Sequence, residues 1–127
     1  MSRRAVGLSG PDRAGGPTRP DRCSGVAVSG PVDFVTDGAA AYRVSNGHAL
    51  MPRVTALGCA LNGVIAAFLV GQDRLGATVA ALAYFGLAGE RAAQGAPGPG
   101  RFQVAFLDAL HALTPDDLRL GARVVPA

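Results

Sequence analysis

The chain has 127 residues, of which 49% are apolar and 17% are charged, and this length allows at most one domain. The composition is too apolar for a chain that is disordered throughout, and the 18 glycines follow no collagen-like period. The formal net charge of +3 comes entirely from residues 1–24, which hold five Arg and two Asp.

Residues 1–24 are rich in Gly, Pro and Arg and show no apolar period, which predicts a disordered basic tail. No apolar stretch follows Arg3 and Arg4, so we do not expect a signal peptide. Nucleic-acid binding by this tail is the weaker interpretation, and we expect no nucleic-acid partner. The ordered domain is expected to span residues 25–127.

Short β-forming runs follow the tail. Residues 26–28 form an apolar run that is typical of a buried strand. Residues 32–35 and 41–44 flank Asp37-Gly38, and an Asp-Gly pair between β-formers favours a hairpin.

Helical periodicity begins near Cys59 and continues to residue 69. Asp73 is a suitable N-cap for a second, mostly apolar helix over residues 74–94. Apolar residues from 102 to 113 mark a third helix, and Thr114 with the following Pro opens a fourth. The first helix is shorter than the ~20 residues that a membrane span needs, and the second lacks an aromatic belt, so we expect no membrane association.

Cys23 and Cys59 are far apart in the chain, and the two histidines are equally scattered. This spacing matches neither a disulfide scaffold nor a zinc site, and it fits a reducing, cytoplasmic compartment.

The turn over residues 55–59 is the segment that indicates chemistry. A glycine-containing turn that opens a helix presents backbone N–H groups at the positive end of the helix dipole, and such a turn favours an anion. Ala56, Leu57 and Gly58 are therefore candidate anion-hole residues, and Cys59 follows them directly. On these residues alone, an ordinary helix start with a small buried Cys59 is the simpler interpretation.

Several segments of residues 25–113 occur in the order and with the spacing of one enzyme family. These segments are VAVSG (26–30), VDFVTDG (32–38), NGH (46–48), RVT (53–55), GCA (58–60), AYFG (83–86), AGE (88–90), GPG (98–100) and LDAL (107–110). In this set the chain resembles the C-terminal half of the hydroxyethylthiazole kinase family, which belongs to the ribokinase-like superfamily. The resemblance implies an α/β fold: short strands with a β-hairpin, then three to four α-helices.

The resemblance also implies a function. The family uses ATP and Mg²⁺ to phosphorylate the hydroxyl of 4-methyl-5-(2-hydroxyethyl)thiazole in thiamine biosynthesis and salvage. By resemblance, Ser29 contacts ATP and residues 56–58 form the anion hole for the transferred phosphoryl group. Ala56 lies against the substrate, and Cys59 sits beside the attacking hydroxyl. Family enzymes assemble as homotrimers, so the resemblance implies a homotrimer for this chain.

Two departures from the family pattern weaken the expectation of activity. Ala56 replaces a glycine, and Leu57 replaces a small residue or Thr. A Cβ at position 56 costs on the order of 1 kcal/mol if φ there is positive. The carboxylates that hold Mg²⁺ are expected in the family's N-terminal half, which nothing in residues 1–24 resembles. We therefore expect a truncated kinase chain, with a non-catalytic remnant or interaction module of the same fold as the alternative.

Overall fold

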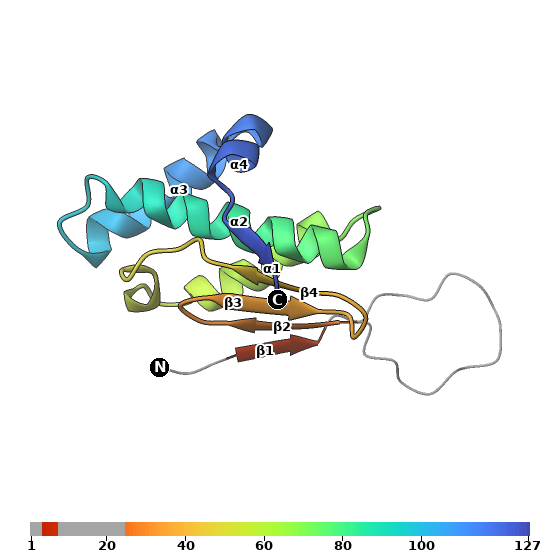
Figure 1. Cartoon of the computed structure of the whole chain (residues 1–127). Helices are drawn as coiled ribbons and strands as arrows, with labels where there is room; N and C mark the ends of the chain where they lie inside the picture. Colours follow the sequence, from red (N-terminus) through yellow and green to blue (C-terminus); the bar gives the residue numbers. More distant parts are fainter. Residues whose placement is uncertain (1–3, 8–24) are drawn as a thin grey trace.

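The computed structural model describes residues 4–7 and 25–127, and it contains one antiparallel sheet of five strands. In chain order the strands are β1 (Arg4–Gly7), β2 (Val26–Ser29), β3 (Asp33–Thr36), β4 (Ala41–Val44) and β5 (Val124–Pro126). Their order in the sheet is the same as their order in the chain (Figure 1). The helices lie between β4 and β5 in sequence, and they pack on one face of the sheet.

The predicted hairpin between β3 and β4 is confirmed, with Thr36 opposite Ala41 in the register. The Asp37 carboxylate accepts hydrogen bonds from the N–H groups of Ala40 and Ala39, at 2.8 and 2.9 Å. These bonds hold the pKa of Asp37 below its usual value. Gly38 adopts φ +91°, a conformation that glycine reaches without steric cost, so the Asp-Gly pair sets the turn.

Strands β1 and β5 are absent from the sequence-based prediction. Strand β1 pairs with the outer edge of β2, and β5 pairs with the outer edge of β4. Each supplies backbone partners to an edge whose N–H and C=O groups would otherwise be unpaired. The predicted tail lies outside the described residues apart from residues 4–7.

Four α-helices and one short 3₁₀ helix form the second layer. They are η1 (Met51–Arg53), α1 (Leu57–Phe68), α2 (Arg74–Ala93), α3 (Pro99–Ala112) and α4 (Pro115–Gly121). The predicted cap of α2 is confirmed, because the Asp73 carboxylate accepts the N–H of Gly76 at 2.7 Å. Gly71, at φ +71°, lies in the turn that separates α1 from α2.

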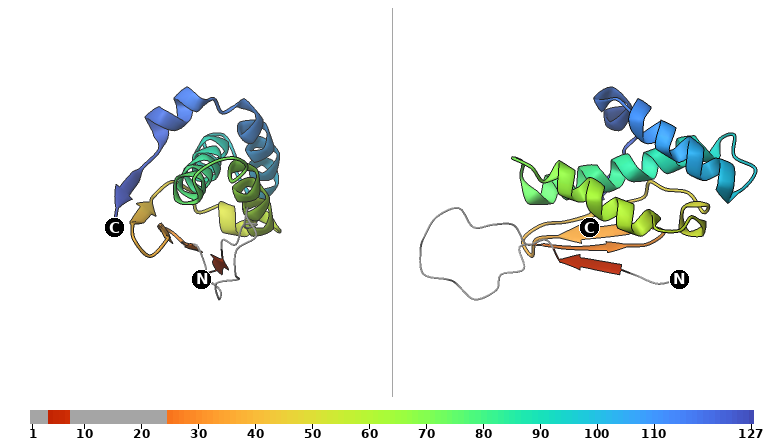
Figure 2. Two further views of the ribbon diagram at one scale, coloured as in Figure 1. Left: turned by 90° about the vertical axis from the view of Figure 1, so that its right-hand side faces the viewer. Right: turned by 180° about the vertical axis from the view of Figure 1, so that it is seen from behind.

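Two apolar clusters flank α2, which is buried along most of its length. The first fills the space between the sheet and the helices, and includes Val35, Val44, Ile65 and Leu82. The second lies between α2 and α3, where the rings of Phe85 and Phe106 meet edge to face at 4.8 Å between centroids. Figure 2 shows α2 enclosed between the sheet and the other helices.

Helix α4 begins at the predicted Thr114 cap, which forms a capping box with Asp117. The N–H of Asp117 donates to Thr114 Oγ1 at 3.2 Å, and the N–H of Thr114 donates to Asp117 Oδ2 at 2.8 Å. The Thr114→Ala variant is expected to lose about 1 kcal/mol of unfolding free energy, as for other N-cap hydroxyls. Urea denaturation measures this loss. Thr114→Ser keeps the hydroxyl and should retain most of the stability; equal losses in the two variants would contradict the capping role.

Candidate functional site

A cleft of about 610 Å³ opens between the sheet and the start of α1. Its walls come from three places: the turn after β2, the loop that follows β4, and the first turn of α1. Helix α2 forms its floor through Leu82, Phe85 and Gly86. A concave, mostly apolar cavity of this size is typical of a small-molecule site.

The first turn of α1 begins with a residue in the left-handed conformation and borders the cleft. Ala56 adopts φ 66° and ψ 6°, and its carbonyl accepts hydrogen bonds from the N–H groups of Cys59 and Ala60, both at 3.0 Å. The N–H groups of Leu57 and Gly58 precede these first helical bonds, and both residues line the cleft. The positive end of the α1 dipole is therefore directed at the cavity.

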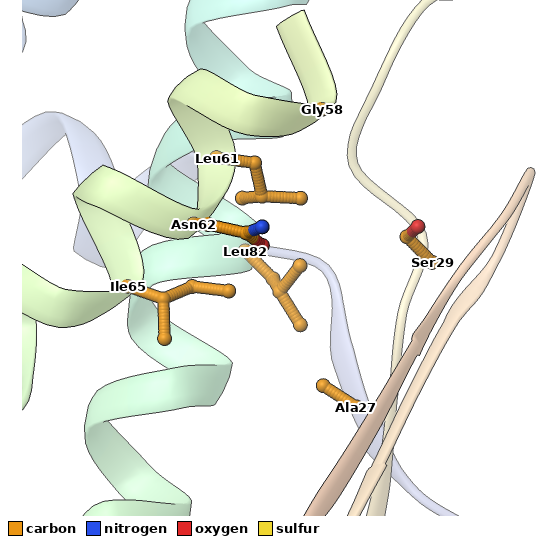
Figure 3. Close-up of a pocket in the computed structure, with 7 residues that line it drawn as sticks. All are labelled: Ala27, Ser29, Gly58, Leu61, Asn62, Ile65 and Leu82. Carbon is orange, nitrogen blue, oxygen red and sulfur yellow. The ribbon is translucent and has the colours of Figure 1, made fainter. Parts of the chain in front are cut away.

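Ser29 ends β2 and faces this helix start. Ser29 and Gly58 line the cleft together, and they also line a smaller hollow of about 20 Å³ beside it. In Figure 3, Leu61 and Leu82 point from the helices toward the strand that carries Ala27 and Ser29. Leu57 and Gly58 thus line the same cleft as Ser29, at the end of β2.

Three of the five candidate residues meet in the cleft: Ser29, Leu57 and Gly58. Ala56 and Cys59 lie outside the set of residues that lines it, and both are exposed. The interpretation of Cys59 as a small buried residue is therefore wrong. The reason is geometric: the buried face of α1 is centred on Ile65, and Cys59 is six positions away, on another side of the helix.

The left-handed backbone of Ala56 makes a direct test possible. A Cβ in this region is strained by about 1–2 kcal/mol, so Ala56→Gly is expected to stabilise the protein by about 1 kcal/mol. Thermal and urea unfolding of the two chains give the difference. Ala60→Gly, inside α1, is the matched control and should destabilise by about 1 kcal/mol. A loss of stability in both variants would show that position 56 is not strained.

Asp33 is a buried carboxyl in the wall of the cleft that the sequence analysis did not single out. Its exposed fraction is 8%, and its Oδ1 accepts the N–H of Gly30 at 2.9 Å. Burial raises the pKa of Asp33 to about 6, although the hydrogen bond from Gly30 opposes this shift. The carboxyl thus holds the turn that follows Ser29.

The opposite wall is held by a polar network that sequence reasoning also missed. Glu90 Oε1 accepts hydrogen bonds from the N–H of Gly47 at 2.8 Å and from Asn46 Nδ2 at 3.1 Å. Arg123 pairs with the same carboxylate at 2.5 Å. Asn46, Gly47 and Glu90 stood in the segments that carry the family resemblance, but Arg123 carried no local signal.

Among the described residues, no cluster of three or more His, Cys, Asp or Glu side chains could hold a metal ion. Within the same ranges, 4–7 and 25–127, none of the helices combines the length and the hydropathy that crossing a membrane requires.

Residues 21–116 match the model of the hydroxyethylthiazole kinase family. The chain belongs to this family. A hydroxyethylthiazole kinase of Cereibacter sphaeroides (strain ATCC 17025) is 67% identical over 102 residues, which are 80% of this chain and 39% of the relative. A hydroxyethylthiazole kinase of Rhizobium leguminosarum bv. trifolii is 58% identical over 104 residues, with the same shares covered.

The fold agrees with a solved hydroxyethylthiazole kinase structure from Pyrococcus horikoshii OT3. The TM-score is 0.76 at 40% identity, and the match covers 80% of this chain and 40% of that protein. The expected family fold is confirmed. The chain spans about two fifths of the length of the family members it matches.

Proposed function

We propose that this chain carries the phosphate-binding part of a hydroxyethylthiazole kinase site. The whole site would use ATP to phosphorylate the hydroxyl of 4-methyl-5-(2-hydroxyethyl)thiazole, in thiamine biosynthesis or salvage. One observation supports this most strongly: in a chain of this family, Ser29 lines the same cleft as Leu57 and Gly58, the first residues of α1. Phosphoryl transfer depends mainly on positioning and on stabilisation of charge, which such donors supply.

Each candidate residue has a part in this proposal. The N–H groups of residues 56–58 would stabilise charge on the transferred phosphoryl group, and Ser29 would donate a hydrogen bond to ATP. Ala56 would lie against the substrate. Cys59, on the first turn of α1, would sit beside the attacking hydroxyl. Magnesium accompanies ATP in the family, and the described residues include no cluster of three or more His, Cys, Asp or Glu side chains that could hold it.

The assembly and the compartment belong to the same proposal. A homotrimer in the cytoplasm is the form that family membership favours. A non-catalytic remnant or interaction module is the second candidate function. It is favoured by Ala56, because a Cβ in the left-handed conformation crowds the turn that must receive the phosphoryl group.

Nucleotide binding separates the two candidates. The chain is mixed with millimolar ATP and Mg²⁺, and its unfolding temperature and backbone amide resonances are followed. The kinase proposal expects a rise in unfolding temperature with shifts centred on Ser29, Leu57 and Gly58. A non-catalytic remnant would show neither the rise in unfolding temperature nor the amide shifts. The absence of both would overturn the kinase proposal.

Two serine variants sharpen this measurement. Ser29→Ala removes a hydroxyl from the cleft and is expected to weaken ATP binding about tenfold, the effect of a hydrogen bond to a charged group. Ser45→Ala is the matched control, because Ser45 is exposed and does not line the cleft.

Turnover of the thiazole alcohol is then assayed for the chain alone, where none is expected, and with the remaining part of a family enzyme added in trans.

A further inference from the structure

The carboxylate of Glu90, on α2, accepts hydrogen bonds from two separate segments of the chain. From the loop after β4 it receives the N–H of Gly47 and the side-chain amide of Asn46. Arg123, in the segment before β5, donates two hydrogen bonds to the same carboxylate. Its Nη2 donates to Oε1 at 2.5 Å, and its Nη1 donates to Oε2 at 3.1 Å. One carboxylate therefore joins three elements that lie far apart in the sequence.

Asn46 closes this network from the other side. Its Oδ1 accepts the N–H of Arg123 at 2.7 Å, and its Nδ2 also donates to the carbonyl of Gly121 at 3.0 Å. Arg123 in turn donates from Nη2 to the carbonyl of Ser45 at 3.0 Å. Asn46 is buried, so these bonds offset the cost of removing its amide from water.

The packing of α2 against the loop is equally close. A Cβ on Gly86 would lie 2.6 Å from the backbone of Asn46, and a Cβ on Gly89 would strike the side chain of Met51. The loop therefore packs closely against the face of α2 that carries Gly86 and Gly89. Glu90 follows Gly89 directly in the helix. Asn46, Gly47 and Met51 also line the cleft, so this contact defines one cleft wall.

We propose that Glu90 is a positioning residue: together with Arg123 it holds the Asn46–Gly47 wall at the distance from α1 that ligand binding in the cleft requires. The ligand affinity in this proposal rests on the phosphate-binding function proposed above, whereas the positioning of the wall does not. Glu90 lines no part of the cleft itself and acts through Asn46 and Gly47.

The charge state of Glu90 suits this role. Partial burial raises the pKa of its carboxyl, but the hydrogen bonds from Arg123, Gly47 and Asn46 outweigh burial and hold the pKa below its usual value. Glu90 is therefore ionised at neutral pH. An ionised acceptor binds the three donors more strongly than a neutral amide would.

The test compares two neighbouring positions on α2. Glu90→Gln removes the charge that binds Gly47, Asn46 and Arg123. Arg91→Gln is the matched control, because Arg91 pairs with Asp117 of α4 and lines no part of the cleft. Both variants are studied at a temperature at which unfolding curves show them to be fully folded. The readouts are hydrogen exchange of the Gly47 amide and the dissociation constant for ATP with Mg²⁺.

Glu90→Gln is expected to speed exchange of the Gly47 amide and to weaken ATP binding, each about tenfold, while Arg91→Gln changes neither. Unchanged Gly47 exchange in Glu90→Gln would overturn the positioning role, and so would wild-type ATP affinity in that variant. If the wild-type chain binds no ATP, the kinase proposal fails, and exchange at Gly47 alone then decides whether Glu90 holds the wall.

Discussion

Asp33→Asn is expected to stabilise the protein above pH 6 and to leave its stability unchanged at pH 4. Asp33 is buried, and its pKa rises from 3.8 to about 6 on folding. Between these two values the unfolded chain ionises while the folded chain stays protonated, so stability falls as the pH rises. At about 1.4 kcal/mol per pH unit, the loss is complete above pH 6 and amounts to at most about 3 kcal/mol.

Asparagine keeps the oxygen that accepts the N–H of Gly30 and removes the ionisation, so the variant should lose this pH dependence. Urea denaturation from pH 2 to pH 8 measures it, a range that also covers the titration of Asp37. Asp37→Asn is the control of opposite sign: hydrogen bonds from Ala40 and Ala39 lower the pKa of Asp37, so its contribution is present above pH 4 and disappears in acid. Parallel curves for wild type and Asp33→Asn across pH 4–8 would rule out a buried ionisation at position 33.

Alanine at Gly86 is expected to destabilise the protein by about 3 kcal/mol, the upper range for overpacking. The added Cβ would lie 2.6 Å from the carbonyl carbon, carbonyl oxygen and Cβ of Asn46. Asn46 is buried and hydrogen-bonded to Glu90, Gly121 and Arg123, so it cannot move away from the added Cβ. The same displacement moves the cleft wall, and Gly86→Ala should weaken ATP binding as well.

Two further glycines make this a graded series. At Gly89 the new Cβ meets the thioether of Met51, a flexible side chain, so Gly89→Ala should cost about 1 kcal/mol. At Gly63, on the exposed side of α1, no atom lies within 4 Å of the new Cβ, and the higher helix propensity of alanine should stabilise by about 1 kcal/mol. Thermal unfolding ranks the variants; a Gly86→Ala variant as stable as Gly89→Ala would contradict the close packing at Asn46.

The elements that sequence analysis predicted are those with local signals. Asp37-Gly38 defines a hairpin by itself, Asp73 caps α2 through the N–H of a residue three positions away, and Thr114 does the same for α4. Each of these features is decided by residues within one turn of chain.

Features that depend on distant partners could not be predicted in this way. Strand β5 exists because Val124 pairs with Val44, and the short run around it has no strand signature of its own. The network around Glu90 joins residues 33 to 78 positions apart, and a single sequence carries no measure of such proximity. The burial of Asp33 depends likewise on how the sheet and the helices pack around the cleft.

Strand β5 leaves the ribosome after all four helices, yet its partner β4 leaves before them. During translation the outer edge of β4 therefore stays unpaired until residues 124–126 have been made, and Arg123 can reach Ser45 and Glu90 only at that moment. Contacts between residues so distant in sequence form slowly because the chain entropy is lost first. The Arg123 contacts that hold the cleft wall can therefore form only after the four helices have been made.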